Sequence, residues 1–173
     1  MMATAHQTAG PYWHLIDHPE WADLTRHGAE GPRIEITGRI TDGAGAAVGD
    51  AMVEIWHADP AGRHDGAFQG FGRCATDREG RFRFVTLKPG PVPGRGNTLQ
   101  APHVQIAIFA RGLLTHLVTR LYFAGEALNE TDPLLARIPE ARRGTLLARE
   151  AAPGVWALDI RLQGEGETVF LDV

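Results

Sequence analysis

Residues 33–40 read Arg-Ile-Glu-Ile-Thr-Gly-Arg-Ile, with isoleucine at the even positions 34, 36 and 40. Successive side chains of a β-strand point to opposite faces of its sheet, so these isoleucines share one face. The stretch therefore predicts a strand with one buried face, and it marks the start of a sheet.

Further segments have the length and composition of short strands, and Gly, Pro or Asp bounds most of them. They are Met52–His57, Arg81–Thr86, His103–Phe109, His116–Phe123 and Gly154–Leu162. The segments Thr41–Gly45 and Thr76–Gly80 supply the Asp and Gly residues of tight turns, and we predict a hairpin connection at each. Many short strands joined by such turns predict a mainly β fold, an antiparallel β-sandwich.

The remaining segments are expected to be irregular or briefly helical. Residues 1–32 are rich in Pro, Gly, His and Trp, which indicates an irregular N-terminal arm with one helical turn near Pro19–Leu24. Thr131-Asp-Pro133 predicts the start of a small helical insertion, because a capping side chain precedes a proline; a second short helix follows over Pro139–Arg143. With no repeat and no linker, residues 1–173 are expected to form a single domain.

Composition argues against several classes of partner. Charged residues make up 22% of the chain, the formal net charge is -4, and Lys and Arg are interspersed with acidic residues. Such a pattern offers no surface for a polyanion, so we expect no nucleic-acid partner. The chain has no apolar stretch of roughly 20 residues, no signal-peptide pattern at its start and a single cysteine, Cys74. We therefore expect a cytoplasmic protein that does not bind a membrane.

The residues that usually carry enzyme chemistry form no recognisable motif. Eight histidines are scattered without an H-x-H or H-E-x-x-H pair, which favours structural histidines over metal ligands. The sequence contains no serine. For Cys74 there are two alternatives: the neighbouring Arg73 lowers the pKa of its thiol, or the thiol is buried and inert; we expect the second. No glycine-rich stretch has the order of a phosphate-binding loop. These patterns alone predict a β-sandwich without an assigned function.

A longer stretch carries a resemblance to a known family. Residues 72–91 read Gly-Arg-Cys-Ala-Thr-Asp-Arg-Glu-Gly-Arg-Phe-Arg-Phe-Val-Thr-Leu-Lys-Pro-Gly-Pro, which resembles the central signature of the intradiol dioxygenases. Val53–Arg63 looks like the strand that enters the active-site region of that family, and Pro102-His103 and Thr119–Phe123 follow in family order. The resemblance covers roughly residues 8–173 and implies the β-sandwich of that family.

Catalytic members of that family bind ferric iron through two tyrosines and two histidines, and this chain departs from the pattern. His64, Val92 and Gln105 stand at three of the ligand positions, and only His103 is retained. Valine has no donor atom, and a glutamine amide is a poor replacement for imidazole. The resemblance therefore implies that this chain binds no metal ion and contributes no catalytic residue.

An intradiol sequence without its ligands resembles the α chains of the two-chain members of the family, in which a homologous β chain carries the Fe(III) ion. The resemblance implies that residues 1–32 pack on the β chain, where Thr8, Gly10 and Pro11 line the substrate pocket. Gly allows close approach of a backbone and Pro fixes it, which makes a rigid wall for a flat aromatic ring. The alternative for these residues is a plain terminal turn.

Arg111, within Ile108–Gly112, resembles the α-chain arginine that faces the mouth of the active site. A guanidinium group matches the geometry of a carboxylate, so we expect Arg111 either to position the carboxylate of a dihydroxybenzoate or to form an intersubunit salt bridge. The end of the chain, Arg161–Val173, is similar to the α-chain terminus.

By this resemblance the assembled enzyme uses O2 to cleave 3,4-dihydroxybenzoate to 3-carboxy-cis,cis-muconate, in the β-ketoadipate pathway of aromatic degradation. This chain is expected to complete the substrate pocket, to be inactive alone and to belong to a higher αβ oligomer. The alternative from another class is a stand-alone transthyretin-like β-sandwich that binds a partner without enzyme activity. A self-sufficient dioxygenase would need more tyrosine ligands, since Tyr12 and Tyr122 fall at no ligand position.

Overall fold

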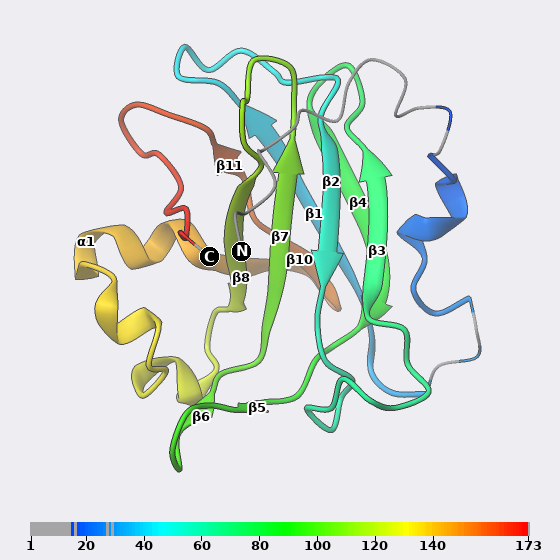
Figure 1. Cartoon of the computed structure of the whole chain (residues 1–173), viewed down its shortest axis with the longest axis vertical. Helices are drawn as coiled ribbons and strands as arrows, with labels where there is room; N and C mark the ends of the chain where they lie inside the picture. The colour runs from blue at the N-terminus through cyan, green and yellow to red at the C-terminus, as the bar shows by residue number, and fades with distance from the viewer. Residues whose placement is uncertain (1–14, 16, 27, 29, 173) are drawn as a thin grey trace, which may run out of the picture.

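The computed structural model describes residues 15, 17–26, 28 and 30–172, and its fold is mainly β (Figure 1). The strands are β1 (Arg33–Thr41), β2 (Met52–Trp56), β3 (Phe71–Ala75), β4 (Arg81–Leu87), β5 (Val92–Pro93), β6 (Leu99–Gln100), β7 (His103–Phe109), β8 (Leu117–Phe123), β9 (Leu147–Ala152), β10 (Val155–Ala157) and β11 (Ile160–Arg161). The helical elements are the 3-10 turns η2 (Pro19–Ala22), η3 (Ala127–Glu130), η4 (Leu135–Arg137) and η5 (Gly144–Leu146) and the helix α1 (Glu140–Arg143).

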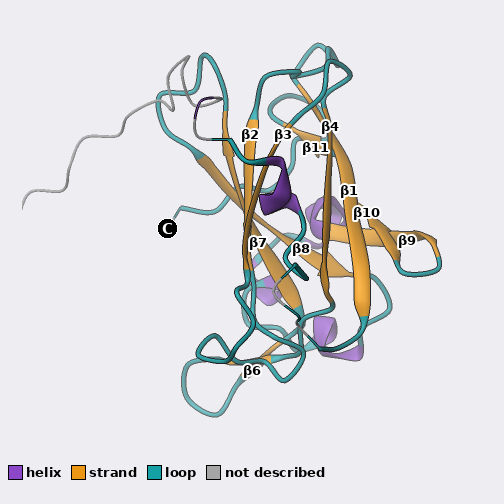
Figure 2. Ribbon diagram, turned by 90° about the vertical axis from the view of Figure 1, so that its right-hand side faces the viewer, coloured by secondary structure: helices purple, strands orange, loops and turns teal. Residues whose placement is uncertain are grey.

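The strands form the two layers of a sandwich (Figure 2). One layer runs β3-β2-β7-β8, and the other places β4 on one edge of β1 with β10 and β11 along the opposite edge. Strand β9 joins the layers, because its first residues pair with β8 and the following ones with β10. The predicted β-sandwich is confirmed; among the described strands, β1–β10, β1–β11 and β8–β9 pair in parallel and the other ladders are antiparallel.

The inner faces of the two layers share one apolar core. Ile34, Ile36 and Ile40 of β1 are 5%, 0% and 0% exposed, as their alternation predicted. They pack with inward side chains of β2, β4 and β7, which include Val53, Ile55, Phe82, Phe84, Val104, Ile106 and Ile108. Each large apolar side chain buried in this way contributes about 1.5–3 kcal/mol, so the core holds the two layers together.

The two predicted turns form, and an antiparallel bridge between Thr41 and Ala47 closes the first of them, but neither turn joins two strands of the same layer as a hairpin connection would. Asp42 accepts hydrogen bonds from the backbone of its own turn, and Asp77 does the same in the turn that ends at Gly80, where φ is 76°. The strands on either side of each turn nevertheless belong to different layers, because β2 pairs with β3 and β7 while β4 pairs with β1. The turns therefore carry the chain across the sandwich.

The segment predicted as one strand over Gly154–Leu162 is two short strands, β10 and β11. Between them the Asp159 carboxylate accepts a hydrogen bond of 2.9 Å from the backbone nitrogen of Arg39 on β1, so a side chain takes the place of the backbone ladder. Strands β3 and β9 were not predicted, since neither Phe71–Ala75 nor Leu147–Ala152 alternates large apolar with polar residues.

The predicted helical insertion is present and covers the outer face of β8. Asp132 caps it as expected, since its carboxylate accepts hydrogen bonds of 2.9 Å from two backbone N–H groups of the following turn. Helix α1 and the turn η2 lie where short helices were predicted. The insertion buries Tyr122, Leu135 and Leu146 in a second apolar cluster. Within the described ranges, no helix has the length and apolar character needed to cross a membrane.

Candidate functional site

Three of the four residues predicted at ligand positions lie at one end of the β2–β7 pair. His103 and Gln105 alternate along β7 and share its outer face, whereas Val104 between them is buried in the core. Trp56 of β2 lies directly opposite Gln105 in the ladder. The imidazole of His64 stacks on the Trp56 indole, with ring centroids 4.2 Å apart. The loop after β2 is thereby folded back over the sheet.

Val92 reaches the same end through the short pair β5–β6. It lies opposite Gln100, whose Oε1 accepts a hydrogen bond of 2.9 Å from Arg120 Nη1 on β8. The loop after β2 approaches β5 so closely only because residue 62 is glycine, with φ 77° and no Cβ; a Cβ at Gly62 would lie 2.0 Å from the Pro91 carbonyl oxygen. The fold thus gathers all four predicted positions around one end of a sheet.

The retained histidine of this end is neutral and hydrogen-bonded. His103 Nδ1 donates to the carbonyl oxygen of Ala101 at 2.8 Å. Burial lowers the pKa of His103 to about 4, and the positive charge of Arg120 acts in the same direction. One nitrogen of the imidazole is therefore committed to the backbone.

A second histidine, His57, packs beneath the same end and was not singled out from the sequence. It is 3% exposed, and its two ring nitrogens lie 2.8 Å from the Ala58 carbonyl oxygen and 2.8 Å from Thr86 Oγ1. The nitrogen that faces the carbonyl donates, so the other accepts from the hydroxyl. Burial lowers the pKa of His57 to about 4, and nearby His64 and His103 add to the shift. It is a structural histidine with both hydrogen bonds satisfied.

A polar network backs this end of the sheet. The fully buried Asp132 carboxylate accepts from the Ala101 backbone nitrogen at 2.9 Å and from the Tyr122 hydroxyl at 3.2 Å. The Tyr122 oxygen in turn accepts a hydrogen bond of 3.3 Å from Arg120 Nη1. Burial raises the pKa of Tyr122 to about 12, so the phenol keeps its proton. Sequence spacing signalled only the capping role of Asp132, because Ala101 and Tyr122 reach its carboxylate only through the packing of the insertion against β8.

These residues do not fit a ferric ion. Val92 has no side-chain donor atom, the phenol of Tyr122 is tied to a carboxylate, and Gln105 offers an amide where the family has an imidazole. Over the described part of the chain, no cluster of three or more His, Cys, Asp or Glu side chains could hold a metal ion. The arrangement orders the end of the sheet through hydrogen bonds and offers no donor set for the family's iron.

Of the predicted substrate-binding residues, Arg111 is the one that the described part of the chain contains. Arg111 follows the opposite end of β7 from His103, its side chain is 88% exposed, and its Nε forms an ion pair with Asp50. Thr8, Gly10 and Pro11 lie outside the described residues, so their predicted role stays a prediction. The structure keeps Arg111 apart from the His103 end and leaves its guanidinium accessible.

The one cysteine is not a nucleophile at ordinary pH. Cys74 is buried in β3, and burial raises the pKa of its thiol to about 12. The neighbouring Arg73 turns its guanidinium to the Glu54 carboxylate instead. The expected buried thiol is confirmed.

Comparison with known proteins points to one family. The profile of a family described as Dioxygenase matches residues 10–164. The α chain of protocatechuate 3,4-dioxygenase from Pseudomonas putida is 40% identical, over 98% of this chain and 96% of that one. The β chain of the Burkholderia cepacia enzyme is 37% identical, over 78% of this chain and 63% of that one. Among solved structures, the dioxygenase domain of a carbohydrate-binding fusion protein from Streptomyces sp. SirexAA-E is similar with a TM-score of 0.67 and 28% identity, over 94% of this chain and 99% of that one.

Proposed function

The chain belongs to the intradiol dioxygenase family, and from that membership we propose that it is the α chain of a protocatechuate 3,4-dioxygenase. Together with a β chain it forms an enzyme that uses O2 to cleave 3,4-dihydroxybenzoate between its hydroxylated carbons. The product is 3-carboxy-cis,cis-muconate, and the reaction is a step of aromatic degradation in the cytoplasm.

The observation that carries the proposal is a full-length likeness to α chains in a chain whose ligand positions do not fit iron. The likeness to the P. putida α chain extends over 96% of that chain, whereas the likeness to a β chain extends over 63% of it. Val92 and Gln105 stand where the resemblance expects iron ligands, and hydrogen bonds to Ala101 and Asp132 hold the groups around them. The β chain is therefore the proposed holder of Fe(III).

This chain's own part is to shape the pocket and to bind the substrate carboxylate. Thr8, Gly10 and Pro11 form the rigid wall proposed for the aromatic ring. Arg111 is suited to the carboxylate because its guanidinium is 88% exposed and has one exposed partner, Asp50, that a ligand can replace. No step of the ring cleavage is assigned to a residue of this chain.

An exposed aromatic face next to the candidate site is the proposed contact with the β chain. Trp56 and Phe71 lie directly opposite one another on β2 and β3, and they are 49% and 42% exposed. Two exposed aromatic side chains that lie side by side on one face of a sheet are typical of an interaction surface, which supports an α chain that is complete only in an αβ assembly.

The test is to measure iron content and 3,4-dihydroxybenzoate-dependent O2 uptake for the chain alone and after co-expression with its β chain. We expect colourless, inactive protein alone and an iron-containing, active complex together. Stoichiometric iron in the isolated chain would contradict the proposed division of labour. A folded chain that does not co-purify with the β chain would instead support a stand-alone transthyretin-like module.

A further inference from the structure

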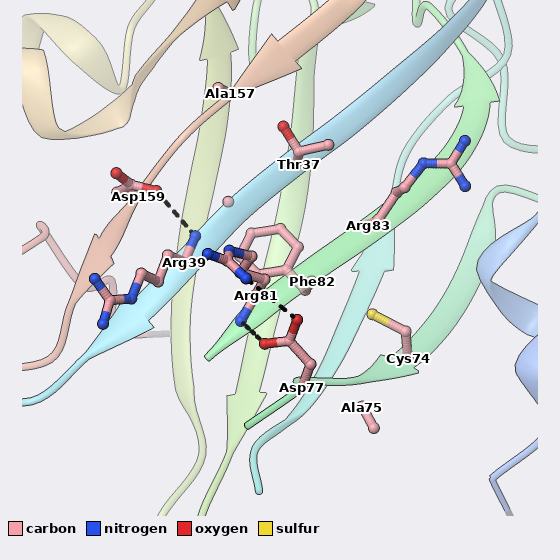
Figure 3. A pocket seen from close by; sticks show the side chains of 11 residues that line it. Thr37, Arg39, Cys74, Ala75, Asp77, Arg81, Phe82, Arg83, Ala157 and Asp159 are labelled. Atoms are coloured by element: carbon pink, nitrogen blue, oxygen red, sulfur yellow. Dashed lines mark hydrogen bonds and ion pairs between the residues drawn. The ribbon is translucent and has the colours of Figure 1, made fainter. Parts of the chain in front are cut away.

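A cleft of about 720 Å³ lies against β1 and β4 and shares no lining residue with the candidate site (Figure 3). Three arginines line it, Arg39 from β1 and Arg81 and Arg83 from β4. Two carboxylates, Asp77 and Asp159, stand at its rim. A cleft of this size is within the range of small-molecule sites, about 300–1,000 Å³.

The register of the sheet brings two of these arginines face to face. Arg39 and Arg81 are directly opposite one another in the antiparallel β1–β4 ladder, and both are exposed. Residues in that relation have Cβ atoms about 4.5–5.5 Å apart, and like charges there destabilise the pair. An anion held between the two guanidinium groups removes this repulsion.

The three arginines of the cleft differ in how closely a carboxylate binds their guanidinium groups. Arg83 makes a bidentate ion pair with Glu35, with hydrogen bonds of 2.8 and 2.6 Å. Arg39 donates its Nε to the backbone carbonyl of Glu79 at 2.8 Å and has no ion pair within the described residues. The ion pairs of Arg81 are long: its Nη1 lies 3.7 Å from Glu79 Oε2 and 4.0 Å from Asp77 Oδ2. Two cations therefore lack a hydrogen-bonded carboxylate.

The carboxylates at the rim are bound to backbone donors. Asp77 Oδ1 accepts hydrogen bonds from the backbone nitrogens of Glu79 and Arg81 at 3.0 and 2.8 Å. Asp159 Oδ1 accepts from the Arg39 nitrogen at 2.9 Å. These carboxylates thus stabilise a turn and a strand junction, and neither makes a side-chain hydrogen bond with the guanidinium of Arg39 or Arg81 across the described part of the chain.

We propose that Arg39 and Arg81 form a binding site for a small dicarboxylate or tricarboxylate. Each guanidinium can hold one carboxylate by two parallel hydrogen bonds, and a short carbon chain spans the distance between neighbouring strands. Ring cleavage of a dihydroxybenzoate gives a tricarboxylate of this class, so the site binds the class of molecule that the enzyme releases. This choice of ligand rests on the proposed function, whereas the anion site rests on the two arginines.

The test is calorimetric titration of the full-length chain with 3-carboxy-cis,cis-muconate at fixed ionic strength. We expect one saturable site whose affinity falls at least tenfold in the double variant Arg39→Gln, Arg81→Gln and is unchanged in the control Arg149→Gln, an exposed arginine of β9. Removal of the like-charge pair should leave the free double variant at least as thermally stable as the wild type. The ligand should raise the melting temperature of the wild type and should not raise that of the double variant.

Other outcomes have definite meanings. No saturable binding, or equal binding by the double variant, would overturn the site. Equal affinity for inorganic phosphate would overturn the carboxylate class, and tighter binding of a poly-glutamate peptide would mark a protein-docking surface instead. If the co-expressed αβ complex is inactive while the tricarboxylate still binds through Arg39 and Arg81, the site is supported and the proposed function is overturned.

Discussion

The two ends of strand β7 differ in how their polar groups are held. At the His103 end, the imidazole is bonded to the backbone, and a buried network of Arg120, Tyr122 and Asp132 lies behind it. At the Arg111 end, the guanidinium is 88% exposed and pairs with a single carboxylate. Hydrogen-bonded polar groups inside a protein stabilise its fold, while exposed ones remain available to a ligand. The residues around His103 are thus held by the fold, whereas Arg111 stays accessible at the surface.

The largest effect is expected from Asp132→Ala at the His103 end. The substitution leaves two backbone N–H groups of the helical turn, the Ala101 nitrogen and the Tyr122 hydroxyl without their acceptor. We expect a loss of about 4 kcal/mol in the free energy of unfolding, measured in urea. Glu130→Ala, an exposed neighbour, is the matched control and should change stability by less than about 0.5 kcal/mol. An equally small loss for Asp132→Ala would mean that the His103 end is no more tightly held than the Arg111 end.

The pH dependence of stability is the next largest effect, and His57 dominates it. Its pKa is about 4 in the folded chain and 6.5 in the unfolded chain, so the unfolded state binds the extra proton first. The contribution of neutral His57 is complete above pH 6.5 and is lost as pH falls toward 4, on the order of 3 kcal/mol in total. His103 shifts in the same direction.

Urea unfolding at pH 7, 6 and 5 measures this effect, and His57→Gln is the comparison variant because an amide can keep the hydrogen bonds without titrating in this range. The variant should lose less stability than the wild type as pH falls. Parallel pH curves for the two proteins would show that His57 is not buried in its neutral form.

At the Arg111 end, Arg111→Ala is expected to raise the KM of the assembled enzyme for 3,4-dihydroxybenzoate by roughly tenfold, equivalent to about 1.4 kcal/mol. The KM for catechol, which has no carboxylate, should change little. Asp50→Ala removes the partner of Arg111 and serves as the control, with the substrate effect absent. Equal weakening of both substrates, or loss of the β chain on purification, would assign Arg111 to assembly.

The smallest effect is expected in the arm. Pro11→Ala and Gly10→Val should change KM or kcat by a few-fold while the iron content of the complex stays intact, because they alter a wall of the pocket and no ligand. Gly10→Val should act more strongly, since it adds a branched side chain where the backbone approaches the ring. Normal kinetics in both variants would remove Thr8, Gly10 and Pro11 from the proposed pocket.

The strands were predictable where one face is strongly apolar. The isoleucines of β1 and the alternation of β7 each mark a buried face through side chains two residues apart. Strand β3 gave no such signal, because Gly72 and Cys74 are the residues it turns inward. The ligand positions could be named by resemblance, but the Arg120–Tyr122–Asp132 network could not, since its members come from a strand and a helical insertion whose packing the sequence does not display.

Reading the sequence was enough to predict the local features of this protein: the strand faces, the two turns, the Asp132 cap and the lack of a donor atom in the Val92 side chain. Each depends on neighbouring residues or on the chemistry of one side chain. Neither the crossing of both turns between layers nor the position of Arg39 opposite Arg81 can be read from the sequence; each follows from the packing of the two sheets. Strand pairing, register and burial join residues far apart along the chain, so they are settled by how the whole core packs.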